Sequence, residues 1–263
     1  MSDRACIIYR YDGSFAGFLT CVYESFYRKE VPADIVDVHF EQFFLYPVTD
    51  IESSDEKAKK LYTSLQRKLS EQTAEYIYHG FLCARYQKEI LLYNFIRKLY
   101  RRGASFADCL ADPDARAVYE ATKQLYNEAH SFKEFARFTE TDGALVAVIA
   151  PKNRVLPLLA NHFADRYNAE TFMIYDETHK EGLVYQGGRF EILPIADLKL
   201  PPMAQEEAHY RQLWQTFFDA IAIEARKNPK LQQSFMPKRY WKHLPEMQDK
   251  ALSEGEGRRY LGN

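Results

Sequence analysis

The pattern of apolar and polar positions predicts a strand, a turn and a helix at the N-terminus. Residues 6–10 are β-branched and aromatic for the most part, and they run into Asp12 and Gly13, which favour a turn. Ser14 is a good helix N-cap. The apolar positions after it follow the helical period: Phe15, Phe18, Leu19, Val22 and Phe26.

Three further helices are predicted in the middle of the chain. A charged helix begins at Ser54 or Asp55 and reaches about residue 69. A second helix covers about residues 82–102 and ends in a basic last turn before Gly103. Asp112 and Pro113 then begin a long helix that reaches about residue 135.

After about residue 137 the period changes from helical to extended. We expect strands over residues 144–150, 172–176, 182–186 and 190–194, a helix over 157–167, and a last long helix over about 204–227. Together these elements predict an α+β fold with a small, mainly antiparallel sheet and several long helices packed around it. We expect a single domain over residues 1–246 and a frayed polar tail over 247–263.

The composition is that of a globular protein, since 46% of the 263 residues are hydrophobic and 15% are aromatic. The four cysteines lie far apart and form no CxxC pair, so the sequence predicts no metal site and no cofactor. The N-terminus lacks the apolar core of a signal peptide, and the most apolar later run is too short to span a bilayer. We expect a cytoplasmic protein that makes no membrane contact.

Positive charge is concentrated near the C-terminus. Residues 225–245 contain six Lys or Arg and no Asp or Glu, whereas the whole chain has a net charge of −2, so the remainder sums to −8 (−2 minus +6). Cations and rings alternate in one part of this segment: Lys238, Arg239, Tyr240, Trp241, Lys242 and His243. Cationic groups bind phosphates and flat rings stack on bases, so we predict that Lys238, Arg239 and Lys242 contact nucleic-acid phosphates and that Tyr240 or Trp241 stacks on a base. The alternative is that both rings pack against the core while the cations stay solvated.

Six other basic residues are candidates for an extension of this surface: His130, Lys133, Arg137, Arg154, His162 and Arg166. The first three are three and four residues apart, which places them on one helix face. His162 and Arg166 are one turn apart in the predicted helix 157–167. Each group has a structural alternative, because cations in a last turn oppose the helix dipole and a histidine beside leucines is often a partly buried polar group.

Two stretches, YRYDGSFAGFLTCVYESF near the N-terminus and FMPKRYWKHLPE near the C-terminus, resemble a family of bacterial proteins of unknown function assigned to DNA metabolism. The resemblance covers most of the chain. It implies a role in DNA repair or modification, because members are partners of a radical-SAM protein similar to spore photoproduct lyase. Other members form an N-terminal extension of proteins similar to uracil-DNA glycosylase. Since this chain has no CxxxCxxC motif, the resemblance places the cluster chemistry in the partner.

The leading hypothesis is an accessory protein that binds DNA, single-stranded or damaged duplex, or presents it to the radical-SAM partner. The sequence has no HExxH, no GxSxG and no nucleotide-binding glycine loop, so we expect no independent catalytic activity. One alternative is a scaffold that contacts the partner protein without touching DNA. A second is an enzyme that acts on a damaged or modified nucleobase, with His130 or His162 near a carboxylate.

Overall fold

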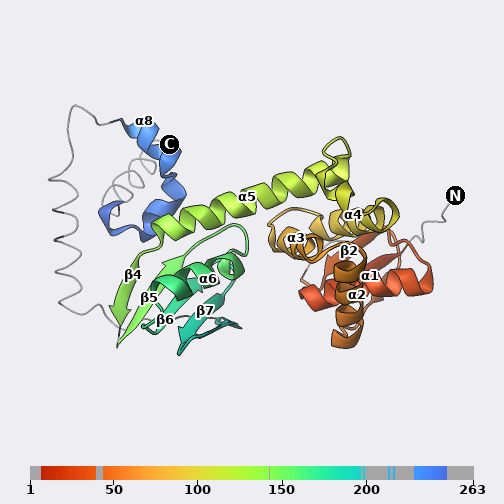
Figure 1. Ribbon diagram of the computed structural model, residues 1–263, viewed down its shortest axis with the longest axis horizontal. Helices are drawn as coiled ribbons and strands as arrows, with labels where there is room; N and C mark the ends of the chain where they lie inside the picture. The colour runs from red at the N-terminus through yellow and green to blue at the C-terminus, as the bar shows by residue number, and fades with distance from the viewer. Residues whose placement is uncertain are drawn as a thin grey trace, which may run out of the picture. The chain divides into compact units, whose positions relative to one another are not determined.

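A computed structural model of the chain describes residues 7–39, 44–141, 143–196, 198, 213, 216 and 228–247. The chain divides into two compact units, Met1–Tyr126 and Asn127–Asn263, which are called unit 1 and unit 2 below (Figure 1). The α+β class is confirmed. The prediction of a single domain over residues 1–246 is not tested by this division, and it stays a prediction. Nearly all of the predicted helix 204–227 and the tail after residue 247 lie outside the described residues.

Unit 1 is built on a small sheet in which every strand is parallel. β1 (Ile8–Tyr11) lies between β2 (Asp34–Asp37) and β3 (Val48–Asp50), and both neighbours run in its direction. α1 (Phe15–Arg28) provides the crossover that a parallel β1–β2 pair needs. The predicted single, mainly antiparallel sheet is therefore corrected to two sheets. β2 and β3 are too short to show a clear alternating pattern in the sequence.

The first two helices begin at the predicted caps. The Ser14 side chain accepts a hydrogen bond from the Gly17 N–H at 2.9 Å and begins α1. Ser54 accepts a bond from the Lys57 N–H at 3.4 Å and begins α2 (Asp55–Lys68). These bonds satisfy backbone donors that have no partner within the helix.

The helix predicted over residues 82–102 is wrong at its start. Leu82 is the last residue of α3 (Glu71–Leu82), and α4 (Lys88–Arg102) begins only after a turn. In that turn Gln87 has a φ of 55°, a left-handed conformation that interrupts the helical hydrogen bonds. Gly103 ends α4 as predicted, with a φ of 86°.

The core of unit 1 joins the sheet to the helices. A short 3₁₀ turn, η1 (Ala104–Asp108), leads from α4 to α5 (Pro113–Phe135), which starts and ends as predicted. Large, fully buried side chains of the core come from β1, α1, β2, α2, α3 and α4, among them Tyr9, Phe18, Ile35, Leu65, Ile77 and Tyr93. The first turns of α5 also contribute, through Ala115 and Val118. The strands β1 and β2, the helices α1 to α4, η1 and the start of α5 therefore share one core.

Unit 2 contains a five-stranded sheet in the order β4-β5-β6-β7-β8 (Figure 1). Its strands are β4 (Phe138–Thr141), β5 (Ala144–Ile149), β6 (Phe172–Asp176), β7 (Glu181–Gln186) and β8 (Arg189–Pro194). β5 and β6 are parallel and are joined by α6 (Leu156–Arg166), while the other neighbours are antiparallel. The predicted strands after residue 143 and the helix are confirmed, whereas β4 was not predicted.

The described C-terminal part begins with α8 (Pro229–Phe235), capped by Asn228. Two 3₁₀ turns follow, η3 (Lys238–His243) and η4 (Pro245–Met247). The segment between Pro237 and Pro245 is therefore helical, with three residues per turn. Within the part of the chain that the structure describes, no helix is long and apolar enough to cross a membrane.

Candidate nucleic-acid interface

The 3₁₀ geometry of η3 changes which of its side chains are neighbours. In a 3₁₀ turn residues i and i+3 share a face, instead of the i and i+4 pairs of an α-helix. Lys238 accordingly lies over Trp241, with its Nζ 5.6 Å from the ring centroid. The Arg239 guanidinium lies 4.7 Å from the centroid of the Tyr240 ring and donates to its hydroxyl at 2.5 Å. Lys238 and Arg239 therefore contact rings of their own segment.

Both rings of η3 are part of the core of unit 2. Tyr240 is 4% exposed and contacts Phe132 and Phe135 of α5, with centroids 5.0 and 5.3 Å apart. Trp241 is 5% exposed, and its indole N–H donates to the carbonyl of Met236 at 3.0 Å. Neither ring offers a free face to a base in this arrangement, which favours the alternative that both rings pack against the core. The stacking role stays a prediction.

Four of the predicted cations lie beside carboxylates of unit 2. The Lys242 Nζ is 2.5 Å from Glu177, the Arg239 guanidinium is 3.6 Å from Glu128, and the Arg137 guanidinium is 2.8 Å from Glu246. Arg154 pairs with Glu181. Lys242 is 66% exposed, so its pair contributes little and can be exchanged for a phosphate. Arg137 instead neutralises a carboxylate that is only 2% exposed, which makes it a structural residue.

Glu128 holds the loop between β5 and α6. Its buried carboxylate accepts bonds from the backbone N–H groups of Lys152 and Asn153, at 3.0 and 2.8 Å, and from the Asn153 side-chain amide at 2.7 Å. Arg239 approaches the same carboxylate. One buried acid therefore ties α5, this loop and η3 together.

Asp176 plays a similar part in the turn after β6. Its fully buried carboxylate accepts bonds from the N–H groups of Thr178 and His179, at 2.9 and 3.0 Å. Its second oxygen is 2.6 Å from Nδ1 of His179. Because β5 and β6 are parallel, this turn and the loop held by Glu128 lie at the same edge of the sheet, where α/β proteins commonly bind ligands.

His243 lies close to this edge and is a poor candidate for a cation. Its Nε2 is 3.5 Å from Glu177 Oε1 but forms no hydrogen bond among the described residues. Burial lowers the pKa of His243, against the opposing effect of Glu177. Burial therefore works against a positive charge on this imidazole.

Three other predicted residues, on α5 and α6, interact through their charges. The pKa of His162 is lowered, first by burial and then by the charges of Lys133 and Arg166, while Asp165 acts in the opposite direction. Arg166 is exposed, and its guanidinium lies 5.7 Å from the centroid of the Tyr167 ring. Lys133, His162 and Arg166 are called the α5–α6 cluster below. His130 is separate in character, since it is highly exposed and lies 3.2 Å from Glu134.

Sequence reasoning missed the acids that organise this surface. Glu128 binds Lys152 and Asn153, 24 and 25 residues away, and approaches Arg239, 111 residues away (239 minus 128), while Glu177 binds Lys242, 65 residues away. The contacts described for Asp176 are with its own turn. The sequence offered a signal for Asp176, which ends a buried strand, because an aspartate in that position often accepts hydrogen bonds from the following turn.

Comparison with known families places the chain in one of them. Residues 86–246 match the family described as a domain of unknown function, DUF4130, which is more than half of the 263 residues. The chain belongs to the DUF4130 family. The DUF4130 match includes all the predicted site residues and begins just before α4, so the N-terminal part of the resemblance lies outside it. No curated protein matches the chain.

Proposed function

We propose that this DUF4130 protein is an accessory protein of DNA metabolism that binds nucleic acid and presents it to a radical-SAM repair or modification enzyme. The resemblance to partners of radical-SAM proteins supports the second half of this proposal. The α5–α6 cluster is the observation that carries the first half.

The charge around His162 suits a phosphate. Lys133 and Arg166 are close enough for their charges to disfavour a proton on the imidazole. A phosphate oxygen beside them would offset that repulsion, and charge-assisted bonds from lysine and arginine are the usual means of holding a nucleic-acid backbone. The contact would be independent of base sequence. It would also be local, because the chain as a whole has a net charge of −2.

Salt-dependent DNA binding tests this assignment. Fluorescence anisotropy of labelled single-stranded and duplex DNA across a salt series should show binding that weakens as salt rises. The double variant Lys133→Ala/Arg166→Ala should reduce the salt slope by about 0.7–0.9 for each phosphate that the protein no longer neutralises. Lys123→Ala, which removes an exposed lysine from the same helix α5, is the matched control and should leave the slope unchanged. Equal slopes in the double variant and the control would refute the phosphate role of the cluster.

The radical-SAM half of the proposal has its own test. The accessory role predicts that the purified partner enzyme binds the protein and that its DNA substrate increases the affinity. A scaffold would bind the partner equally well without DNA and would show no DNA affinity of its own. Isothermal titration of the partner, with and without an ultraviolet-damaged oligonucleotide, separates the two. No association in either condition would refute both.

One observation favours an enzyme acting on a nucleobase as the second candidate function. The buried Asp176 carboxylate lies 2.6 Å from Nδ1 of His179 and orients its ring, as the third group of a nucleophile–base–acid arrangement orients the base. If His179 activates water, the protein should release the base from uracil-containing or damaged single strands, and His179→Gln should abolish release while preserving DNA binding. A wild-type protein that yields no product would exclude this role for the substrates tested.

A further inference from the structure

An exposed aromatic face on α1 is unexplained by the fold of unit 1. Tyr23, Phe26 and Tyr27 follow the i, i+3, i+4 spacing that normally marks a face buried in the core. Here Val22 and Phe18, one and two turns before Phe26, are buried and Tyr23 is partly buried, whereas Phe26 is 44% and Tyr27 is 76% exposed. Clustered apolar surface of this kind marks a binding site more often than scattered single residues do.

The three rings line an open groove of about 510 Å³ together with α2 and the end of α4. The rings of Tyr23 and Tyr27 are nearly parallel, with an interplanar angle of 11° and centroids 6.5 Å apart. Phe26 meets Tyr100 edge to face, with centroids 5.7 Å apart, and the Tyr100 hydroxyl donates to Ser64 Oγ at 3.0 Å. The groove therefore offers several flat apolar faces whose orientations are set by neighbouring side chains.

Lysines border these rings. Lys60 and Lys68 line the groove, and the Lys68 Nζ lies 5.6 Å from the Tyr100 ring centroid. Lys59 and Arg67 continue the cationic surface along a neighbouring hollow of α2. The whole of α2 carries five Lys or Arg and two Asp or Glu, a net charge of +3 (+5 minus 2), on a chain whose total is −2. The Lys60–Glu56 pair is highly exposed on both sides, so an anionic ligand can replace the carboxylate at little cost.

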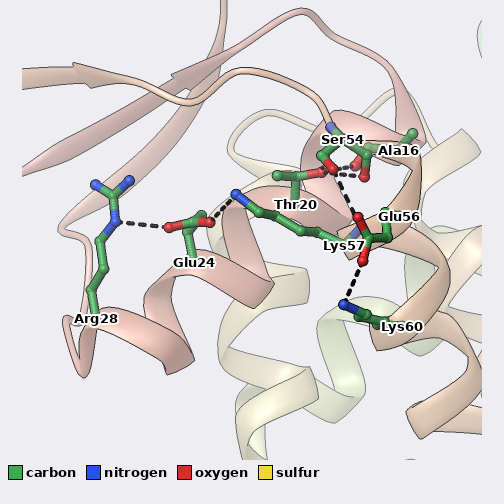
Figure 2. A network of polar contacts seen from close by, with 8 residues as sticks. All are labelled: Ala16, Thr20, Glu24, Arg28, Ser54, Glu56, Lys57 and Lys60. Atoms are coloured by element: carbon green, nitrogen blue, oxygen red, sulfur yellow. Dashed lines mark hydrogen bonds and ion pairs between the residues drawn. The ribbon is translucent and has the colours of Figure 1, made fainter.

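A buried polar network sets α1 and α2 against each other beside this groove (Figure 2). Glu24, whose side chain is 7% exposed, binds Lys57 at 2.7 Å and Arg28 at 2.8 Å. The Thr20 hydroxyl accepts a bond from the Ser54 N–H at 3.2 Å at the start of α2. Hydrogen bonding to Lys57 is the main reason that the pKa of Glu24 is lowered, so its charge is retained at neutral pH. The groove is consequently preformed, which reduces the entropy cost of binding.

We infer that the α1–α2 groove binds unpaired nucleotides of single-stranded nucleic acid. Bases would stack on Tyr23, Phe26 and Tyr27, while the neighbouring lysines contact phosphates. A duplex cannot use the rings in this way, because its bases are already stacked on one another. An acidic peptide would satisfy the lysines but would leave the apolar rings exposed. The inference rests on the proposed function for the choice of nucleic acid, but it assigns a different contact surface on a different unit.

Binding of a short thymidine oligonucleotide tests the inference in the full chain. Because stacking on one ring contributes about 1–3 kcal/mol, Tyr27→Ala and Phe26→Ala should each weaken single-strand binding by about 5- to 150-fold and affect duplex binding far less. Tyr119→Ala is the matched control, since Tyr119 is 42% exposed on α5 and does not line the groove. Lys68→Ala should reduce the salt slope by about 0.7.

Location is measured by ultraviolet crosslinking of the bound oligonucleotide, followed by mapping of the modified peptides. Crosslinks in α1 or α2 that disappear in Tyr27→Ala support the inference. Unchanged binding in both ring variants, with loss only in Lys133→Ala/Arg166→Ala, overturns the groove while the proposed function stands. Loss only in the ring variants supports the groove and removes the α5–α6 cluster as the phosphate site. Polyglutamate that binds as tightly as the oligonucleotide, without dependence on Tyr27, would identify an acidic-peptide site and overturn the inference.

Discussion

Two regions of this protein alternate aromatic rings with cations, and the structure uses them in opposite ways. In η3 the rings of Tyr240 and Trp241 are buried, and Arg239 and Lys242 lie beside carboxylates. In the α1–α2 groove the rings of Phe26 and Tyr27 are exposed, while Lys60 and Lys68 are exposed and Lys60 is paired with the exposed Glu56. The same composition therefore serves packing in one place and suits a ligand in the other. What separates them is which side of each ring the rest of the fold covers.

The largest expected effect tests this contrast directly through stability. Trp241→Ala removes a buried ring and leaves a cavity, so the free energy of unfolding should fall by about 3–5 kcal/mol. Tyr27→Ala removes an exposed ring and should change it by less than about 0.5 kcal/mol. Urea denaturation followed by circular dichroism measures both. Similar losses in the two variants would mean that the contrast between packing and binding rings is mistaken.

The buried acid that anchors η3 should come next. Glu128→Ala leaves the N–H groups of Lys152 and Asn153 and the Asn153 amide without their acceptor, and should lower the free energy of unfolding by about 2–3 kcal/mol. Glu134→Ala, on the same helix but 56% exposed, serves as the control and should cost less than about 0.5 kcal/mol. Equal costs in urea titrations would show that Glu128 does not anchor the loop.

Removing a neutralising carboxylate should make the η3 surface resemble the groove more closely. Glu177→Gln releases Lys242 from its exposed ion pair, so DNA affinity in the anisotropy assay should rise by up to about fivefold, with a salt slope steeper by about 0.7–0.9. Glu191→Gln removes an exposed acid from β8 and separates this local effect from the change in net charge. If both variants gave the same increase, the ion pair would not be what limits Lys242.

The smallest expected effect concerns the charge of His243. Its pKa is lowered in the folded state, so the unfolded chain takes up a proton at a higher pH than the folded one. This histidine's contribution to stability is therefore present above the unfolded pKa of about 6.5 and is lost as pH falls through the folded pKa. His243→Gln should make unfolding less acid-sensitive between about pH 7.5 and pH 5.5 than in the wild type, as urea titrations at the two values would measure. His130→Gln, which removes an exposed histidine, is the control and should leave the pH dependence of unfolding unchanged. An identical pH dependence in wild type and His243→Gln would contradict the lowered pKa.

Much of the local structure could be read from the sequence because its causes are local. Ser14 and Ser54 satisfy backbone donors three residues away, and Asp112 with Pro113 starts α5 where predicted. The break between α3 and α4 escaped prediction, because it depends on Gln87 adopting a left-handed conformation that the apolar period does not reveal. The strands β2, β3 and β4 are only three or four residues long, too short for a reliable alternating pattern.

The candidate sites divide in the same way. The sequence by itself determined which segments are helical or extended, where their caps lie and which stretches are rich in rings and cations, since these properties depend on residues a few positions apart. Only the tertiary structure decided that Phe132 and Phe135 cover Tyr240 from more than 100 residues away, while Tyr27 stays exposed. The physical reason is that burial and charge pairing depend on which distant elements pack together. The residue type of a ring does not determine whether another element will cover it.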